Sequence, residues 1–284
     1  MRFSCAALLL LGVGALQMPA VADTGTDLAE LLAAQPAEVQ ARYPYRHPQA
    51  TLEFFGVQPG MTVLEGLPGG GWYTKLLLPY LGEEGTIIAA DYAMNMWPLF
   101  PFGTEQFVAK RANWLTEFTA MTDDWRSDAS AKVTTMRFGS LPKELAGTAD
   151  VVFFARVLHN LANFEAEGGF LTQAIADAYA ALKPGGVFGV VQHEARVEMP
   201  DEWADGSRGY LKKAFVIEHA EKAGFVFEAD SDINANDADQ PGLEDVVWRL
   251  PPSYRGSSGD AESKAKLDAI GESNRMTLRF RKPD

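Results

Sequence analysis

The stretch Val63–Thr74, VLEGLPGGGWYT, decides the fold of this chain. A short apolar run ends in an acid at Glu65; a proline and three glycines, Gly69, Gly70 and Gly71, follow, and an aromatic pair leads into a helical pattern. Such a run between turn residues predicts a buried strand, and the glycines predict a tight turn into a helix. Free amide groups at the start of that helix would face an anion.

The ligand of this loop stays open between two anions, a dinucleotide pyrophosphate and the carboxylate of a methionine-like tail. The dinucleotide fingerprint G-x-G-x-x-G fails from Gly66, because position 68 is proline, and from Gly69, because position 74 is threonine. The P-loop fingerprint also fails, since no Lys-Ser or Lys-Thr pair follows. A third interpretation is a structural turn that holds no ligand.

Strand and helix patterns alternate along the chain. Predicted strands cover residues 61–66, 85–91, 132–138, 149–155, 187–192, 225–229 and 276–281, and predicted helices cover 72–82, 164–182 and 210–223. Residues 183–186, KPGG, predict a stop and a turn. Apolar strands separated by helices predict an α/β fold with a doubly wound, mostly parallel sheet of seven strands and helices on both faces. Such sheets bind ligands at the carboxyl ends of their strands.

The first 22 residues have the pattern of a cleavable secretory signal. Arg2 precedes an apolar run that is too short to span a bilayer, and the run ends in the small-residue site Ala20-Val21-Ala22. This pattern predicts export across the inner membrane, to the periplasm; the alternatives are an uncleaved anchor and a frayed N-terminal helix. Residues 23–60 predict a helical segment with a turn at 43–49, and residues 61–284 predict the main domain, with insertions at 92–131 and 231–274.

The charge of the chain argues against two classes of partner. The 284 residues include 25 Lys and Arg against 38 Asp and Glu, a net charge of −13. An acidic surface repels nucleic acids and anionic membranes, so we expect no nucleic-acid partner. The mean hydropathy of −0.11 argues against stable membrane insertion, and the expected partner is a small molecule. The single cysteine, Cys5, lies in the predicted signal, so the mature chain has no disulfide and no thiolate nucleophile.

Two acids end the first two predicted strands. Asp91 follows Gly71 by 20 residues. A carboxylate at this position can accept hydrogen bonds from both hydroxyls of a ribose. The alternative is a solvated strand end. Glu65 would orient the glycine loop or meet an ammonium group.

Two histidines follow the next strands. His159 and His193 come after the fourth and fifth predicted strands, and each is a candidate general base. As alternatives, His159 caps a helix or packs on a ligand, and His193 pairs with Glu194 or with a backbone carbonyl. A metal site of these two histidines and Glu194 lacks an obvious further ligand. We expect no metal, and His219, on the apolar stripe of a helix, has no expected catalytic role.

The two insertions and the segment before the first strand also offer contacts to a ligand. Aromatic residues of 92–131 pack in the core or wall an apolar acceptor pocket. Residues 231–274, with a short amphipathic helix, either cap the pocket through Trp248, Tyr254 and Arg255 or form a surface excursion. His47 belongs to a proline-rich segment that either covers the pocket or straps the core.

Taken in order, VLEGLPGGGWYT, AADY, ADVVFFARVLHNL and ALKPGGVFGVVQHEAR resemble the class I S-adenosylmethionine-dependent methyltransferase superfamily. More narrowly, the chain resembles the exported members with a P-G-G-G-W-Y-T loop and a V-L-H-N strand end. The resemblance covers roughly residues 40–284. It implies a Rossmann-like fold, with S-adenosyl-L-methionine as cofactor. Two features depart from the general pattern: Leu67 replaces the first glycine, and Gly139-Ser140 stands where an acid often reads the adenine.

The resemblance also implies the residues of a cofactor site. The glycine loop would hold the methionine part, Asp91 the ribose, and the loop after the third strand the adenine. The implied cofactor-binding residues are Glu65, Gly69, Gly70, Gly71, Asp91, Gly139, Ser140 and Asn160, with Leu141 beside the adenine. The catalytic candidates remain His159 and His193.

The expected function is methylation of an unidentified small molecule. The alternative is an exported Rossmann-like ligand-binding protein that has lost or altered this chemistry. A nicotinamide-dependent oxidoreductase is disfavoured by the failed dinucleotide fingerprint.

Overall fold

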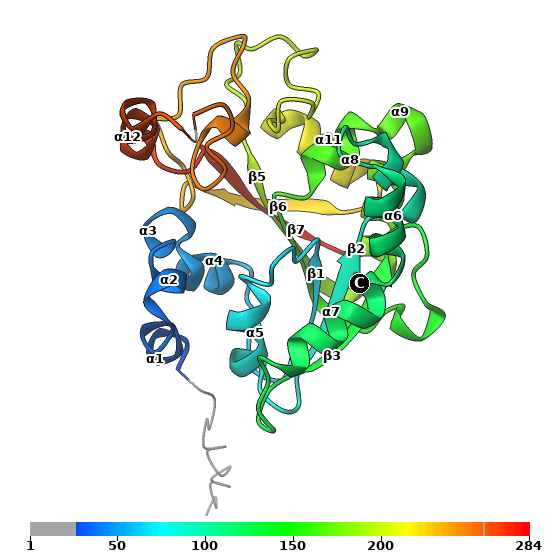
Figure 1. Cartoon of the computed structure of the whole chain (residues 1–284). Coiled ribbons are helices and arrows are strands. Elements are labelled where there is room, and N and C mark those ends of the chain that lie inside the picture. The colour runs from blue at the N-terminus through cyan, green and yellow to red at the C-terminus, as the bar shows by residue number, and fades with distance from the viewer. Residues whose placement is uncertain (1–26, 258) are drawn as a thin grey trace, which may run out of the picture.

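The computed structural model describes residues 27–257 and 259–284 (Figure 1). The predicted secretory signal, residues 1–22, lies outside the described residues. None of the helices in the described part combines the length and apolar character that a membrane span needs.

Seven strands form one sheet in the order β3-β2-β1-β4-β5-β7-β6. Strands β1 to β5 pair in parallel, and β7 runs antiparallel between β5 and β6. The sheet therefore winds outward from β1 in both directions, which confirms the predicted fold class. The strands are β1 (Thr62–Gly66), β2 (Thr86–Asp91), β3 (Lys132–Arg137), β4 (Ala149–Ala155), β5 (Leu182–His193), β6 (Val226–Ser231) and β7 (Arg275–Arg281).

Helices cover both faces of the sheet because alternate strand residues point to opposite sides. Val63 and Phe153 pack with one set of helices, and Leu64 and Phe154 pack with the other. The first set is α1 (Leu28–Ala33), α4 (Pro48–Phe54), α5 (Thr74–Leu81) and α7 (Trp114–Asp123). The second is η1 (Met94–Leu99), α8 (Leu158–Asn163), α10 (Phe170–Ala181) and α11 (Lys213–Lys222). The other helices are α2 (Ala37–Gln40), α3 (Tyr43–Arg46), α6 (Glu105–Ala112), η2 (Lys143–Leu145), α9 (Glu165–Gly168), η3 (Val247–Arg249) and α12 (Ala261–Ile270).

Two predicted boundaries around β5 are wrong. The predicted KPGG turn belongs to β5, because the amide of Gly185 donates to Lys282 O (3.0 Å) and that of Lys282 donates to Gly186 O (3.0 Å). The helix predicted at 210–223 begins only at Lys213, because the amide of Leu211 donates to His193 O (3.0 Å) and keeps that segment extended.

Three helical predictions also need correction. The helix predicted at 164–182 is divided into α9 and α10 by Gly169, whose φ is +65°. The segment predicted as a turn at 43–49 contains the short helix α3 and the start of α4. The helix expected to be amphipathic in residues 231–274 is α12, and it buries no residue.

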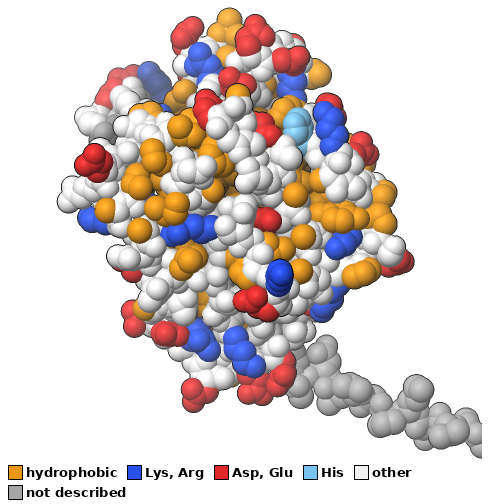
Figure 2. Space-filling view, turned by 90° about the vertical axis from the view of Figure 1, so that its right-hand side faces the viewer, with side chains coloured by type: hydrophobic (Ala, Val, Ile, Leu, Met, Phe, Trp, Pro, Cys, Tyr) orange, Lys and Arg blue, Asp and Glu red, His pale blue; other side chains and the backbone are white. Residues whose placement is uncertain are grey.

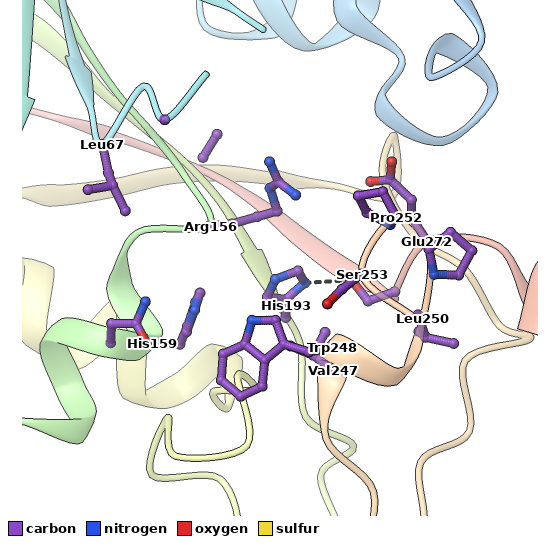
Figure 3. A pocket seen from close by; sticks show the side chains of 15 residues that line it. Leu67, Arg156, His159, His193, Val247, Trp248, Leu250, Pro252, Ser253 and Glu272 are labelled. Atoms are coloured by element: carbon purple, nitrogen blue, oxygen red, sulfur yellow. Dashed lines mark hydrogen bonds between the residues drawn. The ribbon is translucent and has the colours of Figure 1, made fainter. Parts of the chain in front are cut away.

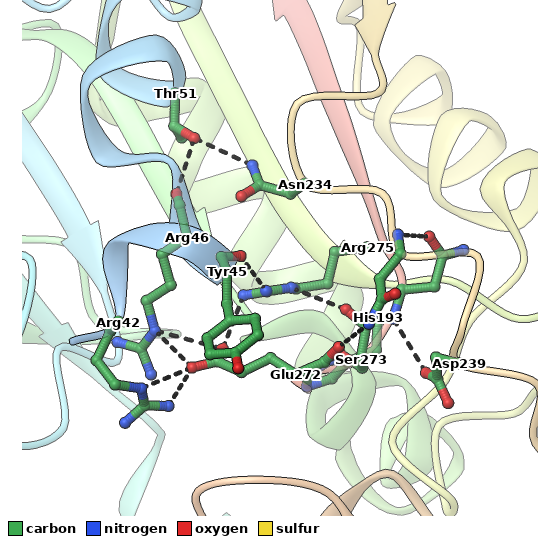
Figure 4. Close-up of polar contacts among 12 residues, drawn as sticks. Arg42, Tyr45, Arg46, Thr51, His193, Asn234, Asp239, Glu272, Ser273 and Arg275 are labelled. Atoms are coloured by element: carbon green, nitrogen blue, oxygen red, sulfur yellow. Dashed lines mark hydrogen bonds and ion pairs between the residues drawn. The ribbon is translucent and has the colours of Figure 1, made fainter. Parts of the chain in front are cut away.

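The segment before β1 is tied to the start of β7 by a buried ion-pair network (Figure 4). Glu272 accepts from Arg42 and Arg46 of the N-terminal segment and from Arg275 of β7, the last at 3.1 Å. The Arg275 guanidinium also donates to Tyr45 O. Asn234 donates to Thr51 Oγ1 (3.0 Å) and to Thr277 Oγ1 (3.0 Å). The N-terminal segment therefore straps the core, and His47 lines a separate cavity beside it.

We expect Glu272→Gln to lower the free energy of unfolding by about 3 kcal/mol or more, because it leaves buried guanidinium groups without a counter-charge. Glu228→Gln is the matched control: Glu228 also pairs with two arginines, Arg279 and Arg281, but its side chain is 36% exposed. The control should cost below about 1 kcal/mol. Urea denaturation measures both, and equal losses would contradict a structural role for the Glu272 network.

Candidate functional site

The glycine loop after β1 has both an open part and a packed part. Leu67, Gly69 and Gly71 all have positive φ, at +47°, +59° and +75°. A Cβ built on Gly70 meets nothing within 4 Å, and one built on Gly69 meets only Leu67 O at 4.0 Å. A Cβ on Gly71 lies 2.3 Å from the Trp125 ring. Gly69 and Gly70 are therefore open to a ligand, whereas Gly71 serves packing.

Glu65, in β1, connects the strand before this loop to the helix after it. It is buried, and its Oε2 accepts a hydrogen bond from Thr74 Oγ1 at 2.7 Å, which joins the end of β1 to the start of α5. Burial raises the pKa of Glu65 to about 7, and the bond from Thr74 opposes part of the rise. The contact connects Glu65 to the end of the loop, and its two predicted roles, orienting the loop or meeting an ammonium group, stay predictions.

Asp91 lies at the carboxyl end of β2, where the sequence predicts it, but it is closed from solvent. Its exposure is 0%, and Arg111 of α6 pairs with its Oδ1. The Arg111 guanidinium also stacks 4.3 Å from the centroid of Trp97. Burial raises the pKa of Asp91, and the charge of Arg111 opposes part of the rise. In this structure Arg111 thus occupies Oδ1 of Asp91.

Asp91 and the side chains linked to it through Arg111 have buried polar atoms without partners. Asp91 Oδ2, Trp97 Nε1, Arg111 Nε and Arg137 Nε make no hydrogen bond with any described residue. Arg111 joins them, because it pairs with Asp91, stacks on Trp97 and accepts at its carbonyl from Arg137 (2.6 Å). Buried polar atoms are normally paired, so a cluster of this kind points to a polar ligand or to water. A ribose hydroxyl, which both donates and accepts, fits this donor and acceptor set.

The loop after β3 lies apart from the glycine loop cavity. Gly139 and Ser140 are exposed, and the amide of Gly139 donates to Asp177 of α10 at 2.6 Å. A Cβ on Gly139 would meet the side chain of Gln173 at 2.7 Å. The structure thus brings neither residue to the cavity described next.

A cavity of about 290 Å³ lies at the carboxyl ends of β1, β4 and β5 (Figure 3), and we call it the main cavity because predicted site residues meet there. It brings together four of the predicted site residues, Gly69, His159, Asn160 and His193. Asn160 donates to Tyr92 OH at 3.2 Å. The full lining is Leu67, Gly69, Ala155, Arg156, His159, Asn160, His193, Val247, Trp248, Leu250, Pro251, Pro252, Ser253, Glu272 and Ser273.

The two histidines face each other with ring centroids 5.4 Å apart. His159 Nδ1 contacts the Gln192 side-chain amide at 3.4 Å, and His193 Nδ1 shares a hydrogen bond with Ser273 Oγ. Neither Nε2 makes a hydrogen bond with a described residue. Burial lowers the pKa of His159 to about 4, and burial followed by the nearby His159 and Arg156 holds the pKa of His193 well below its usual value. Both rings are therefore neutral at neutral pH.

The 231–274 insertion covers the cavity. Trp248 contacts His159 edge to face, with centroids 5.8 Å apart, and Arg255 stacks over Trp248. Of the three predicted contacts, Trp248 lines the main cavity and Arg255 lines a second one, whereas Tyr254 is bonded to Asp268 instead.

The second cavity, about 540 Å³, adjoins the first, since Asn160, Trp248 and Ser253 line both. Phe100 and Phe102 from the 92–131 insertion form part of its apolar wall, whereas Trp114 and Phe118 pack in the core.

Figure 2 shows the face that carries α6 and α9, where hydrophobic side chains are mixed with separate charged ones.

Sequence reasoning missed Arg156, Glu272 and Ser273 as lining residues. Arg156 directly follows β4, and that position was the available signal. Glu272 and Ser273 precede β7, which runs antiparallel, so its amino end meets the carboxyl ends of the parallel strands. Strand direction, which local sequence does not reveal, places them here.

A metal site finds no support in the described ranges. Within 27–257 and 259–284, no group of three His, Cys, Asp or Glu side chains comes together to hold an ion. Glu194 instead lies near Lys213, at 3.8 Å.

The chain matches no family model and no curated protein. Among solved structures it is similar to an S-adenosylmethionine-dependent methyltransferase from Aquifex aeolicus (18% identity, 74% of this chain and 94% of that one, TM-score 0.45). It is also similar to an arsenic(III) S-adenosylmethionine methyltransferase from Chlamydomonas reinhardtii (17%, 90% and 73%, 0.43). A third is phosphoethanolamine N-methyltransferase 2 from Haemonchus contortus, in complex with S-adenosyl-L-methionine (15%, 91% and 60%, 0.46). At these sequence identities and TM-scores, the similarity does not show which reaction this chain catalyses.

We expect Gly71→Ala to lower the free energy of unfolding by about 2 kcal/mol or more, because the new methyl group meets Trp125 at a positive φ. Gly70→Ala is the matched control, since a Cβ there meets nothing within 4 Å. Thermal unfolding of both variants measures the difference. A stable Gly71→Ala protein would show that the glycine is not needed for packing.

The lowered histidine pKa values predict acid sensitivity. The pKa of His159 is lower in the folded protein than in the unfolded chain, so the unfolded chain binds more protons between pH 6.5 and pH 4. The stability that this difference contributes is fully present above about pH 6.5 and is lost as pH falls toward 4. His159 alone accounts for roughly 3 kcal/mol across this window. Urea denaturation between pH 7 and pH 4.5 should show a smaller loss for His159→Gln than for the unchanged protein. Equal losses of stability in the two proteins would mean that folding does not lower the pKa of His159.

Proposed function

We propose that this protein is an S-adenosylmethionine-dependent methyltransferase that acts on a small-molecule acceptor. The observation that carries the proposal is the cluster of unpaired polar atoms around Asp91, at the same sheet edge as the open glycines Gly69 and Gly70. Export to the periplasm, expected from residues 1–22, belongs to the same proposal. The doubly wound sheet supports the proposal by bringing these loops to one edge.

Residues of two loops would hold the cofactor. Asp91 would accept hydrogen bonds from the ribose hydroxyls once Arg111 moves, and the Gly69 and Gly70 amides would face the carboxylate of the methionine part. Thr74, bonded to Glu65, keeps the loop in place. When bound, the cofactor supplies a methyl group on a cationic sulfur, which is already activated for in-line displacement.

The chain's own residues then have two tasks at the acceptor. The main cavity, walled by Trp248 and Leu67, holds the acceptor and excludes water, so positioning supplies most of the catalysis. The neutral rings of His159 and His193, each with an unpaired Nε2, are able to accept a proton from an acceptor that still carries one. Their low pKa makes them weak bases and keeps them ready at neutral pH.

Calorimetric titration with S-adenosylmethionine and S-adenosylhomocysteine tests this function. We expect binding by the unchanged protein and at least a tenfold loss in Asp91→Asn, because a hydrogen bond to a charged acceptor contributes about 1.5–3 kcal/mol. Asp150→Asn is the matched control, since Asp150 lies at the opposite edge of the sheet, where it accepts from Thr62 N at 2.9 Å.

No heat and no thermal stabilisation in a folded protein would overturn the proposal. The alternative of a ligand-binding protein without this chemistry would then stand in its place. Equal weakening by Asp91→Asn and Asp150→Asn would remove Asp91 from the site.

A further inference from the structure

The guanidinium of Arg156 lies in the main cavity without a partner. Within residues 27–257 and 259–284 it makes no hydrogen bond and no ion pair. Figure 3 shows its side chain between Leu67 on one side and Glu272 on the other. A partly buried guanidinium carries five donors and a permanent charge, so an arrangement that leaves all of them unused points to a missing acceptor.

The backbone at Arg156 supports a functional use of this side chain. Its φ is +62°, in the left-handed region that glycine occupies without cost and that other residues rarely adopt. The position is fixed by a hydrogen bond from the Arg156 amide to Val191 O at 2.7 Å. Strained residues of this kind gather at ligand sites, where the side chain is needed in one place.

The charges around the cavity leave an excess of positive charge. Glu272 is the only acid among its lining residues, all of which are described, and its carboxylate is already shared by Arg42, Arg46 and Arg275. The two histidines are neutral. Arg156 therefore adds a fourth guanidinium to a group that holds one carboxylate, although the chain as a whole carries a net charge of −13.

We infer that the main cavity binds an anionic group, a carboxylate or a phosphate, on Arg156. A planar guanidinium binds either anion through two parallel hydrogen bonds. This inference rests on the proposed function and gives the chemical class of the acceptor, a small anion. Its charged group would bind Arg156, and its apolar part would extend past Trp248 into the second cavity, where it would contact Phe100 and Phe102.

A carboxylate has two possible sources here, the acceptor and the methionine tail of the cofactor. The Gly69 and Gly70 amides donate no hydrogen bond to a described residue and can meet the methionine tail. Arg156 instead lines the cavity beside His159, His193 and Trp248, the side chains that would face the acceptor. We therefore assign Arg156 to the acceptor.

Calorimetry with benzoate and its neutral analogue benzamide tests the site. The unchanged protein should bind benzoate at least tenfold more tightly than benzamide, Arg156→Gln should remove this preference, and Arg156→Lys should keep part of it. Arg281→Gln is the matched control, because it removes a guanidinium that pairs with Glu228 at the opposite end of the sheet. Inorganic phosphate that binds the unchanged protein and not Arg156→Gln would equally support an anion site.

No preference for the anion, or full benzoate binding by folded Arg156→Gln, would overturn the inference. Titration with S-adenosylhomocysteine and 5′-methylthioadenosine, which lacks the carboxylate, separates the two sources. Unchanged affinity of Arg156→Gln for both supports the acceptor, and a tenfold loss for S-adenosylhomocysteine alone assigns Arg156 to the cofactor and overturns our assignment. If benzoate binds while S-adenosylhomocysteine does not, the proposed function fails and the anion site stands.

Discussion

A single buried carboxylate, that of Glu272, joins the N-terminal segment to the start of β7, two parts of the chain that are more than 200 residues apart. It neutralises arginines from the N-terminal segment and from β7, and it forms one wall of the main cavity. Buried charges are tolerated only when they are paired. The positions of the N-terminal segment, the start of β7 and the Glu272 wall of the cavity therefore depend on one another. The position of the site is thereby fixed from outside the sheet as well as by the strand ends.

The sheet determines what the site is able to contain. Five parallel strands end at one edge, and β7, which runs the other way, starts there. That edge collects the open glycines of the first loop, the neutral His159 after β4 and His193 at the end of β5, and the polar residues that precede β7. Asp91 with its unpaired neighbours and Arg156 with its free guanidinium thus present two different chemistries, one suited to hydroxyl groups and one suited to an anion.

The strands were predictable because apolar and β-branched runs between prolines and glycines are local signals. Asp91, His159 and His193 were chosen as candidates for the same reason, since each lies at or just after the end of such a run. The closure of Asp91 by Arg111 was not predictable, because Arg111 lies on α6, a helix with no buried residue, and its direction is set by Trp97. The role of Arg156 also depended on tertiary facts, its positive φ and the prior engagement of Glu272. Gly71 has the position of a ligand-binding glycine but packs on Trp125.

A cationic cavity within an acidic protein has a kinetic consequence. An approaching anion is first repelled by the net charge of −13 and is attracted only at short range, by Arg156. Salt screens the long-range field over a Debye length of about 8 Å at physiological ionic strength, while a partly buried guanidinium is screened much less. Ionic strength should therefore speed the association of an anionic ligand rather than slow it, the reverse of the usual electrostatic steering.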